Sequence, residues 1–266
     1  MSDRPRPPRF GEVDRELSYG SYLKVPELLS LQQLESDPPA HDELLFITVH
    51  QVYELWFKQL LFELESARDH MLAGESFQAR HLFERCHWIE QVITQQLPVL
   101  ETMSPQDFLE FRQHLAPASG FQSVQFREIE FLSGLKDTKY LELVTGDPAE
   151  MERLQRRLAE PSLWDAFCTL LELRGLAMPD DSVEGRRETL LAIARDRQRY
   201  YDEFALSEAL LAHDLGFATW RQRHVLMVER QIGTKTGTGG STGAEYLRAT
   251  LTKRFFPELW DLRSYL

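Results

Sequence analysis

The sequence is short of positive charge and of long apolar runs, and each shortage excludes a class of protein. Its 30 lysines and arginines are outnumbered by 42 aspartates and glutamates, which gives a formal net charge of −12. A chain this acidic, with no basic run interleaved with aromatics, would repel a polyphosphate backbone, so no nucleic-acid partner is expected. The longest uncharged apolar stretch, residues 44–53, is far shorter than the roughly 20 residues that span a bilayer. We therefore expect no membrane insertion.

Cysteine is scarce as well. The two cysteines, Cys86 and Cys168, each lie inside a helical pattern among apolar residues and form no CxxC motif. Residues 1–16 combine proline with charge and lack the apolar core of a signal peptide. These features predict reduced core thiols in a cytoplasmic protein, with residues 1–16 as a flexible tail.

Glycine and proline are sparse outside the two ends and one late loop, and the apolar residues follow helical rather than alternating periodicity. The sequence therefore predicts an all-α helical bundle in one domain over residues 17–266. Residues 42–72 are apolar on nearly every face, as in a helix inside a bundle. Further helices are expected over 76–96, from Pro105, before Gly134, from Pro148, over 161–173 and over 188–232, the last with a break near 203–207.

His50 lies in the middle of the 42–72 helix. Phe46, Tyr53 and Phe57 share its face at helical spacing, which favours an aromatic pocket wall around the imidazole. A core histidine bonded to a backbone carbonyl would produce the same pattern, because burying the ring without a partner costs about 1–3 kcal/mol. The residues alone leave both interpretations open.

His224 has similar surroundings near the end of a long helical segment, where Trp220, Met227 and Val228 share its face. A flat apolar cofactor such as haem would fit there, with the neutral imidazole supplying an axial bond to iron. The eight histidines form no HxxxH, HExxH or Cys/His cluster, so a zinc site is unsupported. Spacing alone does not choose between a haem ligand and a core histidine.

Arg112 sits between Phe108 and Leu115 on an otherwise apolar stripe, where a guanidinium needs an anion. A bidentate contact with a substrate carboxylate would meet that need. An internal salt bridge, or a position at the rim of a pocket, would meet it equally well.

The loop GTKTGTGGSTG at 233–243 has the glycines of a phosphate-binding loop but not its order, because Lys235 comes too early and the loop follows a helix. One interpretation is a flexible lid whose backbone amides and threonine hydroxyls close over a carboxylate and exclude water. The other is a plain surface loop.

Five ordered segments resemble the tryptophan 2,3-dioxygenase family, and the resemblance extends from Tyr19 to the C-terminus. They are YGSYL at 19–23, FITVHQVYELWFKQLLFEL at 46–64, FLEFR at 108–112, PASGFQSVQFREIEFLSG at 117–134 and RHVLMVERQIGTKTGTGGSTG at 223–243. The resemblance implies a helical bundle that encloses haem b, with ferrous iron for O2 binding. It further implies a reaction that inserts O2 across the indole C2–C3 bond of L-tryptophan to give N-formyl-L-kynurenine, the first step of the kynurenine route.

The same resemblance implies a role for individual residues. His224 matches the axial ligand of the haem iron, and His50 matches the distal histidine that hydrogen-bonds the indole N–H. Arg112 matches the arginine that pairs with the substrate carboxylate, and Thr238 matches its second polar anchor. The other positions implied in substrate binding are Phe46, Ile47, Thr48, Val49, Phe108, Ser119 and Gly120.

Tyr19 and Tyr22 match tyrosines that complete a neighbouring subunit's pocket in the family, which implies a homotetramer. Phe108 departs from some relatives, which have tyrosine there, so the aromatic wall is kept without a hydroxyl. The connection around residues 180–185 is also shorter than in some relatives. The rival functions are a haem protein acting on another indole or aromatic amine, a haem sensor without turnover, and a haem-free helical interaction protein.

Overall fold

The computed structural model describes residues 17–143, 147–238 and 243–266. No β-strand occurs within these ranges, so the predicted all-α class is confirmed. The α-helices are α1 (Tyr19–Leu23), α2 (Val25–Leu28), α3 (Glu43–Leu72), α4 (Ser76–Gln95), α5 (Leu97–Leu100), α6 (Pro105–Leu115), α7 (Val124–Leu132), α8 (Pro148–Ala159), α9 (Leu163–Leu173), α10 (Val183–Arg195), α11 (Tyr201–Ile232), α12 (Ala244–Ala249) and α13 (Pro257–Asp261). The 3-10 turns are η1 (Gly120–Gln122), η2 (Thr138–Leu143) and η3 (Leu262–Tyr265).

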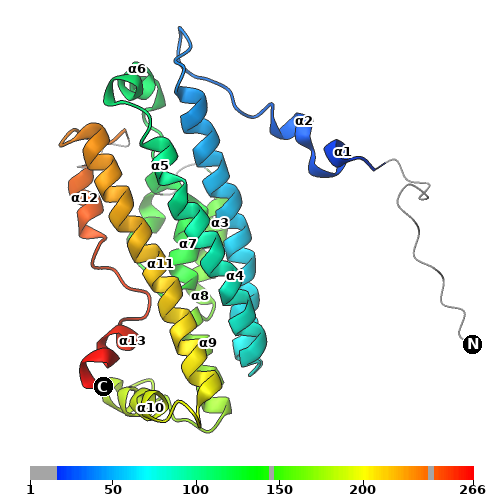
Figure 1. The fold of residues 1–266 in the computed structure, drawn as a ribbon, viewed down its shortest axis with the longest axis vertical. Coiled ribbons are helices and arrows are strands. Elements are labelled where there is room, and N and C mark those ends of the chain that lie inside the picture. Colours follow the sequence, from blue (N-terminus) through cyan, green and yellow to red (C-terminus); the bar gives the residue numbers. More distant parts are fainter. Residues whose placement is uncertain (1–16, 144–146, 239–242) are drawn as a thin grey trace, which may run out of the picture.

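Three long helices, α3, α4 and α11, run side by side and form the centre of the bundle (Figure 1). α4 packs against both of the others, and Gly74, at φ +77, makes the tight turn from α3 into α4. α3 also contacts α7 and α9, which explains why its sequence is apolar on most faces. The predicted position of this helix inside the bundle is confirmed.

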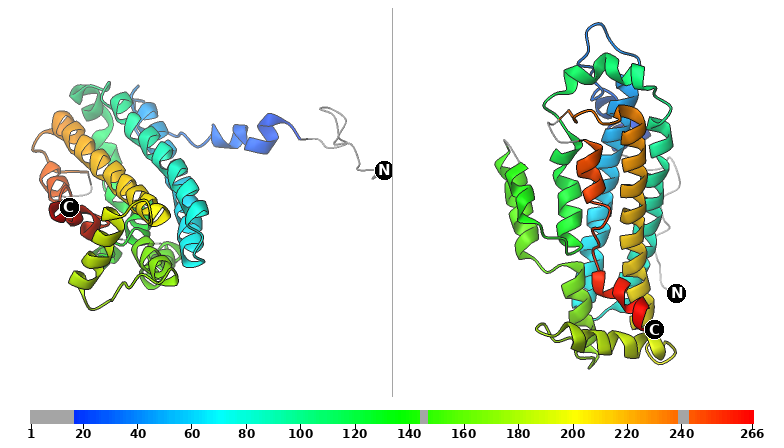
Figure 2. Two further views of the ribbon diagram at one scale, coloured as in Figure 1. Left: turned by 60° about the horizontal axis from the view of Figure 1, so that its bottom comes forward. Right: turned by 90° about the vertical axis from the view of Figure 1, so that its left-hand side faces the viewer.

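The shorter helices close the two ends and the remaining side of the bundle. α8 packs on α7, while α9 and α10 lie at one end (Figure 2). The chain then returns along α11 through α12 and α13, which both contact that helix. At the other terminus, α1 and α2 project away from the bundle as an arm (Figure 1).

The helix boundaries follow the local signals of the sequence at several points. Ser104 and Asp107 form a capping box at the start of α6, and the hydrogen bonds from Ser104 lower the pKa of Asp107. Gly134 follows α7 with a φ of +108, as a residue past a helix end requires. α4 ends at Gln95, two residues before the short helix that contains Pro98, so the break expected at this proline is also confirmed.

The break predicted near residues 203–207 is wrong, because these residues lie inside α11. The interruption instead falls at 196–200, between α10 and α11. Glu203 stands in the first turn of α11, near the positive end of the helix dipole, and pairs with Arg174 at 2.8 Å. The Ser207 hydroxyl donates to the Phe204 carbonyl within the helix. These polar groups therefore stabilise a helix start and do not end a helix.

Two smaller boundaries also differ from expectation. α9 begins at Leu163 and not at Pro161, because Ser162 and Asp165 form its capping box. α10 begins at Val183, five residues before the helical segment expected from the sequence, with the Ser182 hydroxyl accepting from the Gly185 N–H.

Both cysteines are free thiols, as predicted. Cys86 is buried and Cys168 is half-buried, and burial raises the pKa of both, that of Cys168 to about 12. The predicted flexible tail at 1–16 lies outside the described residues. None of the helices in the described ranges has the length and apolarity that crossing a membrane requires.

Candidate active site

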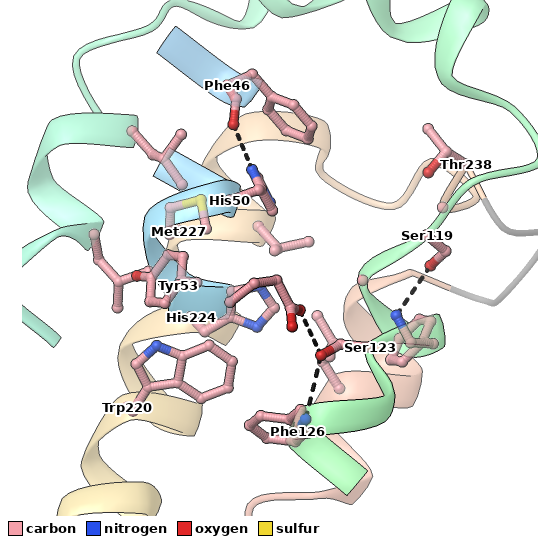
Figure 3. Close-up of a pocket in the computed structure, with 18 of the residues that line it drawn as sticks. Phe46, His50, Tyr53, Ser119, Ser123, Phe126, Trp220, His224, Met227 and Thr238 are labelled. Atoms are coloured by element: carbon pink, nitrogen blue, oxygen red, sulfur yellow. Dashed lines mark hydrogen bonds between the residues drawn. The ribbon is translucent and has the colours of Figure 1, made fainter. Parts of the chain in front are cut away.

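A cavity of about 670 Å³ lies inside the bundle, walled mainly by α3, α7 and α11, with α6, α12 and the loop before α12 completing it. This volume falls within the roughly 300–1,000 Å³ of small-molecule and cofactor sites. Most of the wall is apolar, including the side chains of Phe46, Phe108, Phe126, Trp220 and Met227. Polar groups enter at a few points, and Figure 3 shows the two histidines among them.

His224 reaches the cavity from α11. Its imidazole stacks on the indole of Trp220, one helical turn earlier, with ring centroids 4.9 Å apart and planes 7° from parallel. Burial, together with a smaller contribution from the nearby charge of protonated His50, lowers the pKa of His224 to about 4. The ring is therefore neutral near pH 7. It makes no hydrogen bond to any described residue, so its nitrogens are available to a ligand in the cavity.

His50 reaches the same cavity from α3, with a defined tautomer. Its Nδ1 lies 2.7 Å from the Phe46 carbonyl oxygen, and because a carbonyl only accepts, Nδ1 must carry the proton. Burial lowers the pKa of His50, an effect that this backbone hydrogen bond and the Glu54 carboxylate oppose in part. In the neutral ring, Nε2 then keeps a free lone pair. His50 can accept a hydrogen bond from an N–H group in the cavity.

The low pKa of His224 predicts that the haem-free protein loses stability in acid. Unfolded His224 binds a proton near pH 6.5, but folded His224 does so only near pH 4. Between these values the unfolded state binds more protons, so unfolding free energy falls as pH falls, by up to about 3 kcal/mol. We expect urea unfolding at pH 7 and pH 4.5 to show a larger loss for the unaltered protein than for His224→Gln. Equal losses would contradict a neutral His224 imidazole in the folded protein.

Arg112 and Thr238 both line the cavity, and both contact the backbone of the facing segment. Arg112 donates to the Thr236 carbonyl and makes no ion pair with any described residue, so an internal salt bridge is not what balances its charge there. The Thr238 hydroxyl donates to the Ala118 carbonyl at 2.8 Å. These contacts tie the loop after α11 to α6 and to the turn before η1. Most of the guanidinium donors have no partner among the described residues.

The glycine-rich loop is described except for residues 239–242, so the lid interpretation lies partly outside the described residues. Its far end is closely packed, because a Cβ added at Gly243 would come within 2.6 Å of the Lys235 carbonyl oxygen. Gly243 also has a φ of +63, which disfavours any other residue there.

Ser119 and Gly120 lie on the cavity wall at the start of η1. The Ser119 hydroxyl accepts from the Phe121 N–H at 3.4 Å (Figure 3). A Cβ added at Gly120 would meet no atom within 4 Å, so the backbone here borders open space.

The structure also brings into the site a cluster that sequence reasoning missed. Glu54, one turn after His50 on α3, accepts from the Ser123 hydroxyl at 2.6 Å and from the Gln125 amide at 2.8 Å. Ser123 in turn accepts from the Phe126 N–H at the start of α7. The cluster holds the turn that carries Ser119 against α3. One feature of the sequence could have indicated part of this cluster. Glu54 follows His50 at i, i+4 spacing, which places its carboxylate on the same helix face.

The remaining predicted positions divide into two groups. Phe46 and Phe108 line the cavity together, with ring centroids 5.8 Å apart. Ile47, Thr48 and Val49 are not among the described residues that line it, because the helix turns them to other faces, and Val49 packs into the main core.

Tyr19 and Tyr22 lie on the projecting arm and are 80% and 70% exposed, so neither reaches the cavity of its own chain. The base of this arm does reach it, since Leu28 and Leu31 line the wall. Gln51 of α3 donates to the Leu31 carbonyl at 3.0 Å and holds that base in place.

These features can be tested for their fit to a flat, apolar metal cofactor. His224 offers one neutral imidazole with no hydrogen-bond partner among the described residues, which is the donor that a haem iron takes from histidine. The apolar walls, and the open space beside Gly120, suit the faces and edge of a macrocycle. The residues present therefore fit haem, with His224 as the side chain that could hold its iron.

The fold and the cavity together define an all-helical protein with a ligand site inside its bundle. Residues 9–179 and 181–266 match the family model described as tryptophan 2,3-dioxygenase. A curated relative of that name from Nocardioides sp. is 60% identical over 97% of each chain. Relatives of the same name from Herpetosiphon aurantiacus and Caulobacter vibrioides are 46% and 41% identical, over 96% and 95% of this chain and 100% and 99% of their own.

The chain belongs to the tryptophan 2,3-dioxygenase family. The resemblance drawn from its five sequence segments is thereby confirmed over most of the chain, and so is its place among oxidoreductases of the dioxygenase class.

Proposed function

We propose that this protein is a haem-dependent dioxygenase that inserts both atoms of O2 across the indole C2–C3 bond of L-tryptophan to give N-formyl-L-kynurenine. This would be the first step of tryptophan breakdown by the kynurenine route, carried out in the cytoplasm. The proposal rests mainly on one observation, that α3 and α11 bring two neutral histidines to one apolar cavity. His50 has a free lone pair on Nε2, whereas neither ring nitrogen of His224 is hydrogen-bonded to a described residue. Both oxygen atoms end in the product, so no net electrons are consumed.

Haem b, when bound with ferrous iron, supplies the oxygen chemistry. His224 holds the iron through its neutral imidazole. His50 accepts a hydrogen bond from the indole N–H at Nε2, because its Nδ1 proton is committed to the Phe46 carbonyl. Phe46 and Phe108 form the aromatic wall against which the indole lies. The chain's contribution is thus binding, orientation and exclusion of water.

A second set of polar residues, Arg112 and Thr238, holds the amino-acid end of the substrate. Arg112 pairs with the carboxylate, and the Thr238 hydroxyl provides a second anchor, since both line the cavity. Ser119 and Gly120, which line the cavity, would border the edge of the cofactor. Ile47, Thr48 and Val49 belong to the same substrate-binding segment as Phe46, although their side chains do not line the cavity.

The reaction is tested by supplying purified protein with haem, reducing it and adding L-tryptophan in air. We expect stoichiometric haem and a product with the fragments of N-formylkynurenine in mass spectrometry. Turnover of indoles without the amino-acid carboxylate, at rates equal to that of tryptophan, would favour a different substrate class. A tryptophan-induced spectral change without product would favour a haem sensor.

Replacing His50 by alanine is expected to slow turnover without abolishing it, by about 10- to 100-fold, because one hydrogen bond that orients the indole is lost. A tryptophan methylated at the indole nitrogen, which cannot donate, should be affected far less by His50→Ala. Equal effects of His50→Ala on both substrates would show that His50 does not accept from the indole N–H.

We further propose a homotetramer in which the arm of one chain completes the cavity of another. Tyr19 and Tyr22 are exposed on a projecting arm, an arrangement that leaves aromatic side chains free for a neighbour. In oligomers assembled from Tyr19→Ala chains and His224→Ala chains, a Tyr19→Ala chain keeps His224 and can take an intact arm from a His224→Ala neighbour. We expect the mixture to regain turnover above that of either variant alone, because exchanged arms then form sites in which both residues are intact. A mixture no more active than the two variants measured separately would contradict the exchange of arms.

A further inference from the structure

A chain of buried polar side chains lies behind the cavity wall and joins three helices. Glu90 of α4, His213 of α11 and Ser133, directly after α7, are each at most 4% exposed. His213 Nδ1 lies 2.5 Å from Glu90 Oε1, and His213 Nε2 lies 2.9 Å from the Ser133 hydroxyl. The other carboxylate oxygen, Glu90 Oε2, is buried and has no hydrogen-bond partner in the part of the chain that the structure describes. Such an unmatched group costs about 1–3 kcal/mol, so it calls for a partner.

Glu90 lines a second, much smaller cavity, of about 10 Å³, together with Gly216 and Trp220. A volume near one probe sphere is close to the smallest that holds a single water molecule. Gly216 is what leaves this room, because a Cβ added there would come within 2.4 Å of Glu90 Oε2. The space is thus small, partly polar and dependent on a glycine.

Trp220, which also lines this small cavity, supplies a second unmatched polar group, its indole N–H. Its Nε1 is buried and has no hydrogen-bond partner among the residues described. Burial raises the pKa of Tyr53 to about 12, and the nearby Trp220 N–H opposes this shift. The Tyr53 hydroxyl donates to the Ile93 carbonyl at 3.0 Å, and its geometry with the indole N–H does not make a hydrogen bond. An indole N–H only donates, whereas a water molecule accepts and donates, so water can satisfy Trp220 and Glu90 at once in either protonation state of the carboxyl group.

We infer that one internal water molecule bridges Glu90 Oε2 and the Trp220 indole N–H, and that Glu90 thereby positions the indole ring that stacks on His224. The bridge extends the buried chain from Ser133 and His213 to the cavity wall. Because the Trp220 and His224 rings are parallel at 4.9 Å, rotation of the indole would force the imidazole to move. The role of Glu90 and Trp220 as positioning residues rests on the proposed function of His224 as iron ligand; the water bridge does not.

The bridge is tested by crystal structures of the unaltered full-length protein, with haem and without it. We expect one ordered water within about 3.2 Å of both Glu90 Oε2 and Trp220 Nε1 in each structure. A dry cavity, or an indole N–H bonded directly to the Tyr53 hydroxyl, would overturn the inference.

The positioning role is tested by the iron–imidazole stretching band of the ferrous haem protein in resonance Raman spectra. Gly216→Ala fills the small cavity, and Trp220→Phe keeps a stacked ring but removes the N–H. We expect a shifted or broadened band in both. Gly185→Ala is the matched control, since it also puts a methyl into a crowded helical site, 2.8 Å from Pro179 Cγ, but far along the chain in α10.

Three outcomes distinguish the water bridge, the positioning role and the proposed function from one another. An ordered water together with an unchanged band in both Gly216→Ala and Trp220→Phe would refute the positioning role. A band shifted equally by Gly185→Ala would refute it too, because a general loss of packing would then explain the change. Failure of the unaltered protein to bind haem would contradict the proposed function, while the crystal structures would still decide the bridge.

Discussion

His224→Ala is expected to lose stoichiometric haem and, with it, more than about 100-fold of its turnover. Removing groups that merely orient a metal ligand already costs about 10–100-fold in affinity or activity, so removing the ligand itself should cost more. The substitution also leaves a space of imidazole shape above Trp220, whose ring the histidine covers. Free imidazole added to the variant should therefore restore part of the haem binding.

The control for this prediction is His81→Ala, since His81 is a surface histidine of α4 with its side chain 64% exposed. Its haem content and turnover should match those of the unaltered protein. Normal haem content in His224→Ala, combined with haem loss in His50→Ala, would show that the two histidines have the opposite roles.

Arg112→Ala is expected to lower kcat/KM for L-tryptophan by about 10- to 100-fold, mostly through a higher KM. Hydrogen bonds to charged groups contribute about 1.5–3 kcal/mol, and the carboxylate would lose a bidentate partner. Arg112 is available for this contact because it makes no ion pair with a described residue. Arg112→Lys should recover only part of the loss, since an ammonium cannot form two parallel hydrogen bonds.

The decisive comparison uses tryptamine, which has the indole and amine of tryptophan but no carboxylate. Arg112→Ala should change binding of tryptamine little, so the preference for tryptophan should collapse in the variant. Arg248→Ala is a suitable control, because Arg248 forms a surface ion pair with Glu229 and its side chain is 60% exposed. If Arg112→Ala kept the preference for tryptophan, Arg112 would not read the carboxylate.

How far the fold follows from the sequence depends on whether the signal is local. Capping pairs such as Ser104 with Asp107 lie three residues apart, and they correctly placed the start of α6. The apolar faces of α3 correctly placed it inside the bundle. The break near 203–207 was misplaced because acidic residues and a serine favour both a loop and the first turns of a helix. The ion pair of Glu203 with Arg174, which only the folded chain contains, favours the first turn of a helix over a loop.

The candidate site, like the fold, could be predicted from the sequence only where the signal is local. The faces that carry His50 and His224 can be read from helical spacing, and the family resemblance supplies their roles. The contact of Arg112 with the Thr236 backbone joins residues 124 positions apart, and Glu54 meets Ser123 across 69 positions. Such pairs have no local pattern, so only the folded chain reveals them.

The most direct test of the central claim is the fate of labelled oxygen gas in a reaction of the haem-loaded protein with L-tryptophan. The account predicts a single product, heavier than tryptophan by two oxygen atoms, with both of them labelled and with the fragments of N-formylkynurenine. A product that carries one labelled oxygen, or haem-loaded protein that yields no product, would contradict it.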